Sequence, residues 1–451
     1  MTIILKIFYY RINDEIILIV RKIVGPLTGI LSKGIYYSGM RSLGLKMALW
    51  AYRMSYTKAT RDLIKNQMQK EKFTQHLTRM VSSPVDLETA AYKSLIIRWP
   101  EIEDHKIIAK GILIITFTST FSFFLKNIRI NTLAKYFRIV LEPSWAGYFD
   151  PDILAWEKLA KDPVFIETSE IKDRASLLLF DKLIPVSIGA SDWVDYNFFN
   201  KGETPKVYDS VYVANTTQVK RVHRYLEAIN AITKMGVKYK GALVCGNWGG
   251  RKEEVISIHK HYKLSGRCDL FFELNPVELR TVLWKSKVDI LLSYKEGSNR
   301  SLFEALFCNI PVMVLEENIG VNKSYINEFT GKVINDDLLE IGLLKMCDGW
   351  RKYRPRNWAI KNITPEITTK KLCSIIRNQT GENPVDSKND KTLIKVNRPE
   401  IEYMNYTEFN KCSFNAGFLE LFMKEENDID TKVNGFKDLF RVKVNKKVLE
   451  H

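Results

Sequence analysis

The most informative stretch of this chain is Leu291–Pro311, with the sequence LLSYKEGSNRSLFEALFCNIP. An apolar strand, Val288–Leu292, is expected to run into a polar turn, and a helix is expected to begin near Asn299 or at the residue after it. Glu296 lies in the turn, and Glu304 lies eight positions later on the first turns of the helix. In α/β folds, ligands bind beyond the carboxyl ends of strands, and phosphates favour helix N-termini because the first N–H groups lack partners within the helix. The stretch therefore predicts a site where backbone N–H groups face a phosphate and two carboxylates hold hydroxyls of a ribose or a sugar.

The order of residues in this stretch resembles the Glu-x7-Glu motif of retaining glycosyltransferases that have the GT-B fold, family four in the usual classification. In that family a strand is followed by Glu-Gly, a short polar turn, a helix with Glu-Ala, and a Pro before the next strand. Here Glu296–Gly297 and Glu304–Ala305 occupy the two motif positions, and Pro311 precedes the strand Val312–Leu315. Two solvated glutamates on a helix are the alternative, and the flanking strand–turn–helix–Pro–strand order favours the motif.

The resemblance implies an α/β protein of GT-B type, in which two Rossmann-like domains face each other across a cleft and a nucleotide-diphosphate sugar is the donor. Glu304 is then expected to hold the ribose hydroxyls and Glu296 to contact the donor sugar, with the main-chain N–H groups of Ser298–Ser301 turned toward the phosphates or the sugar. The implied catalytic residues are Glu296 and Lys220. The implied donor-binding residues are Glu304, Gly297, Ser298, Asn299, Arg300, Ser301, Asn215, Asn247 and Arg251.

Binding of the diphosphate is the point at which the chain departs from the family. Members commonly use an Arg and a Lys five positions apart, shortly after the first strand of the second domain. Lys220 matches the lysine, whereas Asn215 stands at the arginine position and cannot neutralise charge. Arg300 and Arg251 are basic groups at strand ends, and we expect them to supply the missing charge, although a solvated helix start explains Arg251 nearly as well. Asn247 belongs to a glycine-rich turn, GNWGG, whose backbone can approach a ligand closely.

The acceptor side is less clearly specified. An irregular loop, Glu142–Asp152, contains polar and aromatic candidates, among which we single out Trp145, Tyr148 and Asp150. The two aromatic residues fit stacking on a sugar ring and fit a place in the core equally well. Many family members place a His near the donor sugar, but His105 is expected to be structural because it starts a strand. The general base therefore stays open.

No cofactor is expected beyond the donor substrate itself. Retaining members of the family commonly work without a metal, and the donor phosphate accepts the proton. The two Asp-x-Asp pairs are not at suitable strand ends, because Asp150 and Asp152 flank a Pro in a loop and Asp428 and Asp430 lie near the end of the chain. Metal-independent transfer is the resulting expectation.

Alternating strand and helix signals divide the chain into four parts. These are a basic helical N-terminal extension (1–99), a Rossmann-like acceptor domain (100–205), a Rossmann-like donor domain (206–378) and a polar, partly helical tail (379–451). The first domain is expected to begin with one buried strand, Lys106–Thr116, followed by a helix over Phe121–Tyr136. Such alternation predicts a mostly parallel sheet in each domain, with helices on both faces.

The positive charge is concentrated near the N-terminus. The formal net charge is +16, and positions 1–80 hold 14 Lys and Arg against 4 Asp and Glu, so that +10 (14 − 4) lies there. Aliphatic and aromatic residues are interleaved with these charges, which suits an anionic membrane surface and also suits nucleic acid. A helical extension that simply packs on the main domain explains the pattern as well as membrane contact does, and nucleic acid is the weaker interpretation.

The location expected from the sequence is the cytoplasm, with peripheral contact to a membrane. Uncharged runs are shorter than the roughly 20 residues that a spanning helix needs, and Asp14 and Glu15 interrupt the apolar run that a signal peptide would require. The six cysteines form no CxxC pairs, which favours reduced thiols.

The function expected from these features is transfer of a sugar, with retention, to the hydroxyl of a glycan or a lipid-linked acceptor. Two other classes stay open. One is a nucleic-acid-binding or nucleic-acid-modifying protein that uses the basic N-terminus. The other is a non-catalytic relative with the GT-B fold, an alternative that rests on Asn215.

Overall fold

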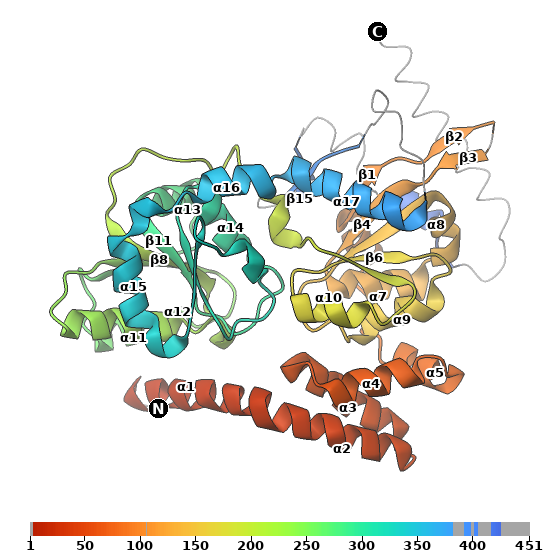
Figure 1. Ribbon diagram of the computed structural model, residues 1–451, viewed down its shortest axis with the longest axis horizontal. Helices are drawn as coiled ribbons and strands as arrows, with labels where there is room; N and C mark the ends of the chain where they lie inside the picture. The colour runs from red at the N-terminus through yellow and green to blue at the C-terminus, as the bar shows by residue number, and fades with distance from the viewer. Residues whose placement is uncertain (1–2, 105, 382–391, 398–400, 405–415, 425–451) are drawn as a thin grey trace, which may run out of the picture.

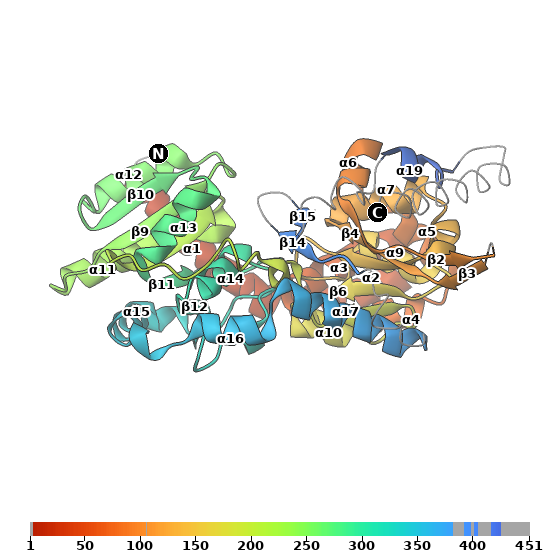
Figure 2. The same cartoon turned by 90° about the horizontal axis from the view of Figure 1, so that it is seen from above.

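The computed structural model describes residues 3–104, 106–381, 392–397, 401–404 and 416–424. Two α/β domains lie side by side, and helices from the N-terminal part of the chain form a layer beneath both of them (Figure 1). The view turned by 90° shows the same two bodies with this layer behind them (Figure 2).

One long, continuous helix dominates the N-terminal layer. Helix α1 (Ile3–Ile19) passes through a π-helical turn (Val20–Val24) into α2 (Gly25–Tyr37), and together they extend under both domains (Figure 1). Helix α2 packs closely on α3 (Arg41–Ser55), because a Cβ added to Gly44 would lie 2.6 Å from the backbone nitrogen of Tyr36. The shorter helices of the layer are α4 (Lys58–Gln67) and α5 (Glu71–Arg79), whereas α6 (Leu87–Tyr92) packs on the first domain (Figure 2).

The first domain is built on a five-stranded sheet of order β1-β4-β5-β6-β7. Strand β1 runs antiparallel to β4, and the other neighbours are parallel. The strands are β1 (Ser94–Arg98), β4 (Gly111–Thr116), β5 (Phe137–Glu142), β6 (Val164–Glu167) and β7 (Leu183–Val186). The helices are α7 (Thr118–Asn127), α8 (Ile130–Tyr136), α9 (Pro151–Leu159) and α10 (Ile171–Leu177).

Three local expectations for this region are wrong. Strand β1 lies in a stretch expected to be helical; all its residues are buried, and a short apolar run does not distinguish a buried strand from a buried helix. The strand expected over Lys106–Thr116 is split, because β3 (Lys106–Ala109) leaves the sheet to form an antiparallel hairpin with β2 (Glu101–Glu103). The helix expected over Phe121–Tyr136 is also split, into the end of α7 and the whole of α8.

The second domain contains a six-stranded, fully parallel sheet of order β10-β9-β8-β11-β12-β13. Counted along the domain, this order is 3-2-1-4-5-6, in which the direction of winding reverses between the first strand, β8, and the fourth, β11. Ligands bind at that switch point in doubly wound folds. The strands are β8 (Tyr208–Asn215), β9 (Gly241–Gly246), β10 (Cys268–Phe272), β11 (Ser286–Leu291), β12 (Val312–Leu315) and β13 (Gly331–Ile334). The helices between them are α11 (Val222–Lys234), α12 (Lys252–His261), α13 (Pro276–Trp284) and α14 (Arg300–Phe307).

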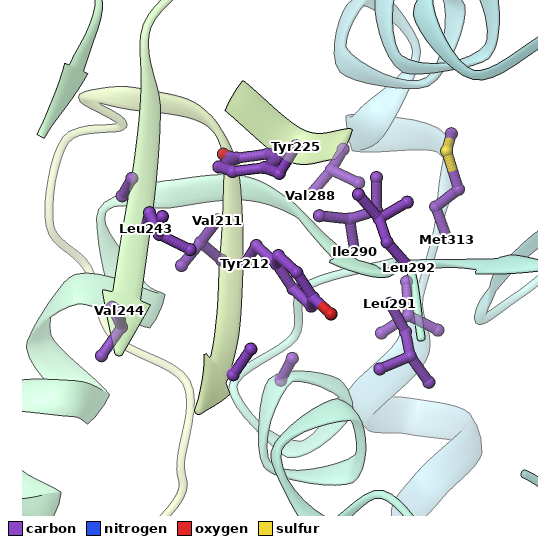
Figure 3. Packing of buried hydrophobic residues seen from close by; sticks show 14 of the residues in the cluster. Val211, Tyr212, Tyr225, Leu243, Val244, Val288, Ile290, Leu291, Leu292 and Met313 are labelled. Atoms are coloured by element: carbon purple, nitrogen blue, oxygen red, sulfur yellow. The ribbon is translucent and has the colours of Figure 1, made fainter. Parts of the chain in front are cut away.

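The core of this domain fixes the strands on either side of the switch point. Tyr212 of β8 points toward Ile290 and Leu292 at β11 (Figure 3), and these three residues and Val211 are buried in one apolar cluster. Because both strands are held by a continuous apolar layer, the polar turns at their carboxyl ends are held in fixed positions.

The last helices tie the two domains together. Helices α15 (Leu339–Asp348) and α16 (Pro355–Asn362) follow the second sheet, and α17 (Pro365–Thr380) then crosses back to the first domain (Figure 1). There Leu372 of α17 joins a buried cluster with Phe165 of β6. The described parts of the region after position 378 also pack on the first domain. They are the strands β14 (Lys395–Asn397) and β15 (Ile401–Tyr403) and the helix α19 (Ala416–Glu420).

The carboxyl ends of the two sheets face each other. The loop after β5 touches the turn after β11, where the backbone N–H of Ala146 donates to the carbonyl of Glu296 at 3.1 Å. Two Rossmann-like α/β domains that meet at their ligand-binding edges, with a helical extension at the N-terminus, confirm the predicted GT-B fold class. Within the described part of the chain, no helix combines the length and the apolar character needed to cross a bilayer.

Candidate active site

The turn between β11 and α14 has a shape that its own side chains enforce. Asn299 caps α14, because its Oδ1 accepts the backbone N–H of Leu302 at 3.0 Å and the hydroxyl of Ser301 at 2.8 Å. Gly297 has no room for a side chain, since an added Cβ would lie 1.8 Å from the carbonyl oxygen of Ser144 in the first domain. Three of the predicted donor-binding residues are thus the ones that shape the turn.

Glu296 and Lys220 form a buried ion pair at the switch point. The Lys220 Nζ lies 2.6 Å from Oε1 and 2.7 Å from Oε2 of Glu296, and the two side chains are 13% and 6% exposed. Lys220 ends the short 3-10 turn that follows β8, whereas Glu296 follows β11, so the pair joins the two strands where the sheet order reverses. The hydroxyl of Ser293 donates a further hydrogen bond to Glu296. An anionic ligand that draws Lys220 to itself would free the carboxylate to accept hydroxyl groups.

Glu304 is buried at the start of α14 and faces a partner at the surface. Its side chain is 3% exposed, and the Nε of Arg300, whose side chain is 45% exposed, lies 2.9 Å from its Oε1. Burial raises the pKa of Glu304, and the Arg300 charge acts in the opposite direction. Such a carboxylate can accept ligand hydroxyls in place of Arg300.

The turns after β8 and β9 lie against each other beside this pair. The backbone N–H of Thr216 donates to the carbonyl of Trp248 at 2.9 Å. Asn215 closes the first turn, because its Oδ1 accepts the N–H of Thr217 at 3.0 Å. Asn247 is exposed in the second turn. Asn215 therefore shapes the backbone near the site, and Asn247 is open to solvent at its edge.

Arg251 is directed toward the N-terminal helix. Its guanidinium carbon lies 5.5 Å from the ring centre of Tyr10 in α1, and its Nε lies 3.7 Å from Glu254 in α12. In this structure Arg251 contacts Tyr10 and Glu254, and the basic group that contacts Glu296 is Lys220.

Sequence reasoning missed a buried ion network next to Lys220. The side chain of Arg221 is 3% exposed; its Nε donates to Asp14 of α1 at 2.8 Å, its Nη1 to the carbonyl of Leu292 at 3.2 Å and its Nη2 to Asp336 at 2.5 Å. The Nε2 of His223 lies 2.9 Å from the same Asp14 oxygen. The signal that the sequence offers for this network is Asp14, an acidic residue on the side of an apolar helix that is buried.

The network connects the N-terminal helix to both halves of the ion pair. Arg221 directly follows Lys220, and its hydrogen bond to Leu292 holds the end of β11, four positions before Glu296. Burial raises the pKa of Asp14, but the His223 hydrogen bond and the Arg221 charge outweigh it, and the pKa lies below its usual value. Asp14 is thus a charged, inward-facing residue that helps to position the site.

The acceptor-side candidates differ in their surroundings. Trp145 is 48% exposed, whereas Tyr148 is buried and its backbone N–H donates to Asp173 at 2.8 Å. Asp150 caps the N-terminus of α9 and pairs with Arg53 of α3. Tyr148 and Asp150 are therefore engaged in contacts of the fold, and Trp145 is the candidate that a bound acceptor can reach.

Side chains from the two domains meet around the turn that carries Glu296. The hydroxyls of Ser298 and Ser191 are hydrogen-bonded to each other, and the Ser191 N–H donates to Ser298 Oγ at 3.0 Å. Farther along, the hydroxyl of Tyr325 donates to Asp192 at 3.1 Å. Burial raises the pKa of Asp192 to about 7. Ser298, predicted to bind the donor, therefore also joins the domains.

The described residues contain no group of three or more His, Cys, Asp and Glu side chains arranged to hold a metal ion. His105 and the pair Asp428 and Asp430 lie outside the described residues.

One family model matches part of the chain. Residues 195–338, about a third of the sequence, match the family model of glycosyl transferases group 1. A comparison with curated proteins gives no match.

Solved structures show partial likeness at low identity. TarM, known from S. aureus, is 16% identical over 59% of this chain and 54% of its own, with a TM-score of 0.48. The pneumococcal O-GlcNAc transferase GtfA, in complex with UDP and GlcNAc, is 13% identical over 56% and 54%, with a TM-score of 0.44. Sucrose-phosphate synthase from Thermosynechococcus elongatus is 13% identical over 60% and 74%, with a TM-score of 0.47. The chain spans about half the length of TarM and of GtfA.

The family match covers the second sheet from β8 to β13 and contains the buried pair and the second motif carboxylate. Residues 195–338, with Lys220, Glu296 and Glu304 among them, thus carry the pattern of the glycosyl transferases of group 1.

Proposed function

We propose that this protein transfers a sugar from a nucleotide-diphosphate sugar to the hydroxyl of an acceptor. The observation that carries the proposal is the Lys220–Glu296 pair, buried at the switch point of the second sheet, in a turn whose backbone is hydrogen-bonded to Ala146 of the first domain. The match of residues 195–338 to group 1 glycosyl transferases supports it independently.

The proposed roles follow from the contacts of each side chain. Lys220 binds the diphosphate and stabilises the charge that grows on it as the glycosidic bond breaks. Glu304 accepts the ribose hydroxyls in place of Arg300, which then turns toward the phosphates. Glu296, freed from Lys220, accepts hydroxyls of the donor sugar. Trp145 offers its ring to the acceptor from the other domain.

The proposal includes two details of the reaction: transfer retains the anomeric configuration of the sugar, and it needs no bound metal. Lys220 supplies positive charge where a metal would otherwise act, and the donor phosphate takes the proton from the acceptor hydroxyl. Turnover unchanged by EDTA, together with a product anomer identical to that of the donor by NMR, is the expected result. Inversion of the anomer would overturn the assignment of retention.

The proposed acceptor is a glycan or a lipid-linked molecule, and the proposed setting is the cytoplasm. The five cysteines in the described residues, Cys245, Cys268, Cys308, Cys347 and Cys373, are buried free thiols, which supports a reducing compartment.

Thermal unfolding with UDP, GDP, ADP and their sugars tests the donor site. A ligand that binds only the folded state stabilises it by about 2.7 kcal/mol at roughly a hundredfold excess over its dissociation constant. We expect one nucleotide to stabilise the wild type and Glu103→Gln, a control on the exposed β2 hairpin, but to have much less effect on Glu304→Ala. Equal stabilisation of all three proteins would show that Glu304 does not contribute to nucleotide binding.

A non-catalytic relative with the same fold is the second candidate. Asn215 favours it, because the position holds no positive charge and its side chain closes a turn. Donor binding without either transfer or hydrolysis of the donor would support this alternative.

A further inference from the structure

The N-terminal helix exposes a continuous row of large apolar side chains. Within the described residues, eight of them recur every three or four positions from α1 through the π-helical turn into α2, and each is between 38% and 62% exposed. We call this row the apolar stripe; it consists of Leu5, Phe8, Ile12, Ile16, Ile19, Ile23, Leu27 and Ile30. At 1.5 Å per residue its length is about 38 Å.

The stripe lies opposite the side of the helix that packs on the protein. Tyr10 and Asp14 of α1 and Gly29 and Ser32 of α2 are buried against the rest of the molecule. Figure 1 shows this helix as the outermost layer under both domains. Soluble proteins rarely expose so long a row of apolar side chains to water, and such a row marks a surface that binds a partner.

The charges next to the stripe indicate the chemistry of that partner. Arg11, Lys22 and Lys33 recur at intervals of eleven, which is three helical turns, so they follow one edge of the helix. All three are exposed, although Arg11 also pairs with Glu227. Glu15 is the exposed acid of this helix.

We propose that the apolar stripe lies in the surface of an anionic lipid bilayer, with the helix parallel to the membrane plane and both domains above it. Amphipathic helices with one apolar face and basic residues beside it lie parallel to the bilayer, at the boundary of headgroups and acyl chains. The basic edge is complementary to anionic headgroups. A second copy of this chain fits less well, because two such faces would bring their basic residues together.

This inference goes beyond the proposed reaction and does not depend on it. Binding to vesicles is measured without turnover, so an inactive protein can still support it, and an active enzyme that ignores vesicles would overturn it.

Vesicle co-sedimentation of the full chain tests the proposal. We expect binding to phosphatidylcholine vesicles that contain about 30% phosphatidylglycerol, and weaker binding to phosphatidylcholine alone. Ile12→Glu combined with Ile23→Glu should lower the partition coefficient by at least about tenfold, because two side chains no longer enter the acyl boundary. The matched control is Leu178→Glu with Ile341→Glu; these residues are 69% and 50% exposed in the two domains, and their replacement should leave binding unchanged.

A charge variant tests the second half of the proposal with the stripe intact. Lys22→Gln combined with Lys33→Gln should weaken binding to the anionic vesicles by about fivefold per residue and leave binding to phosphatidylcholine unchanged. Light scattering during size-exclusion chromatography gives the oligomeric state of each protein. The proposal is overturned if folded wild type ignores both kinds of vesicle, or if the stripe variant binds like the control. It is also overturned if wild type forms a dimer that the stripe variant loses and neither protein binds vesicles.

Discussion

Lys220→Met is expected to lower the free energy of unfolding by about 2–3 kcal/mol. The replacement removes an ammonium that lies 2.6 and 2.7 Å from the two carboxylate oxygens of Glu296. Loss of one partner from a fully buried pair costs roughly 3–5 kcal/mol, because the remaining charge is left unpaired. Here Lys220 is 13% exposed and Ser293 still donates to Glu296, so water and the hydroxyl recover part of that cost.

A double-mutant cycle separates the pair from its surroundings. Glu296→Gln keeps the size of the side chain and lets Lys220 turn toward water, so its expected loss is smaller, about 1–2 kcal/mol. The double variant holds neither charge, and its loss should be about 2 kcal/mol less than the sum of the two single losses. Urea unfolding of the four proteins at neutral pH, with equal slopes, measures this coupling. Single losses that add to within about 0.5 kcal/mol would refute the interaction.

Lys220→Met and Glu296→Gln should have different effects on the affinity for the nucleoside diphosphate. In the proposed reaction the diphosphate takes over Lys220, so Glu296 competes with the ligand for the ammonium. Lys220→Met is therefore expected to weaken binding of the nucleoside diphosphate by at least about tenfold. Glu296→Gln should keep or tighten that binding while transfer from the nucleotide sugar falls. If titration calorimetry finds the same weakening in both variants, the pair does not compete with the ligand and the proposed exchange is wrong.

Three other substitutions test the surroundings of the site. Glu304→Ala should lower kcat/KM for the donor by roughly 10- to 150-fold, the equivalent of one charge-assisted hydrogen bond; unchanged kinetics would exclude Glu304 from donor binding. Asp14→Asn should destabilise by about 2–4 kcal/mol at neutral pH. Although burial acts the other way, the His223 hydrogen bond and the guanidinium beside it hold the pKa of Asp14 low, so this stability is present above the usual carboxyl pKa and is lost as pH falls through the folded value. Urea unfolding should show the gap between variant and wild type closing at acid pH, and a constant gap would contradict the ion pair. Asp192→Asn should act in the opposite sense. Burial raises the pKa of Asp192 to about 7, so its charge opposes folding above that pH and the effect fades as pH falls toward the usual value. The variant should exceed wild type by about 1–3 kcal/mol at alkaline pH and match it in acid.

The second domain is the part of the fold that could be predicted most closely. Its strands from β8 to β12 are short runs rich in buried apolar residues, and a helix separates each of them from the next. The edge strand β13 is partly exposed and follows β12 without an α-helix between them. The helix expected near Asn299 begins at Arg300, and the strand after Pro311 has the expected bounds. These features depend on neighbours in the sequence, and local patterns are enough to place them.

Contacts between distant positions could not be predicted. Asp14 reaches Arg221 across 207 positions, and Lys395 reaches Glu142 across 253. No spacing or composition links such residues, because the pairing exists only after the helical layer and the strand pair of β14 and β15 have packed on the domains. The sequence pattern therefore points to the motif carboxylates and to their basic partners Lys220 and Arg300, but not to the network of Asp14, Arg221 and Asp336 beside them.

The acceptor-side residues show a different limit. Tyr148 and Asp150 have side chains of the right chemistry in the right loop, yet one is buried and the other caps a helix. Residue type indicates what a side chain can do, whereas the direction in which it points depends on the turn of an irregular loop. Trp145, in the same loop, is left exposed.

The N-terminal helix contacts the proposed donor site and carries the proposed lipid-binding surface. Asp14 faces inward to Arg221, whereas Ile12, two positions earlier, faces outward, because a helix turns by about 100° per residue. The two faces can therefore be altered separately. Ile12→Glu with Ile23→Glu should weaken vesicle binding as stated above and preserve donor binding, and Asp14→Asn should preserve vesicle binding. Donor affinity measured with and without vesicles then separates two roles of the membrane. An affinity that vesicles leave unchanged would mean that the membrane serves only to hold the protein near the proposed acceptor. A change that Asp14→Asn removes would locate the coupling in the contact between Asp14 and Arg221.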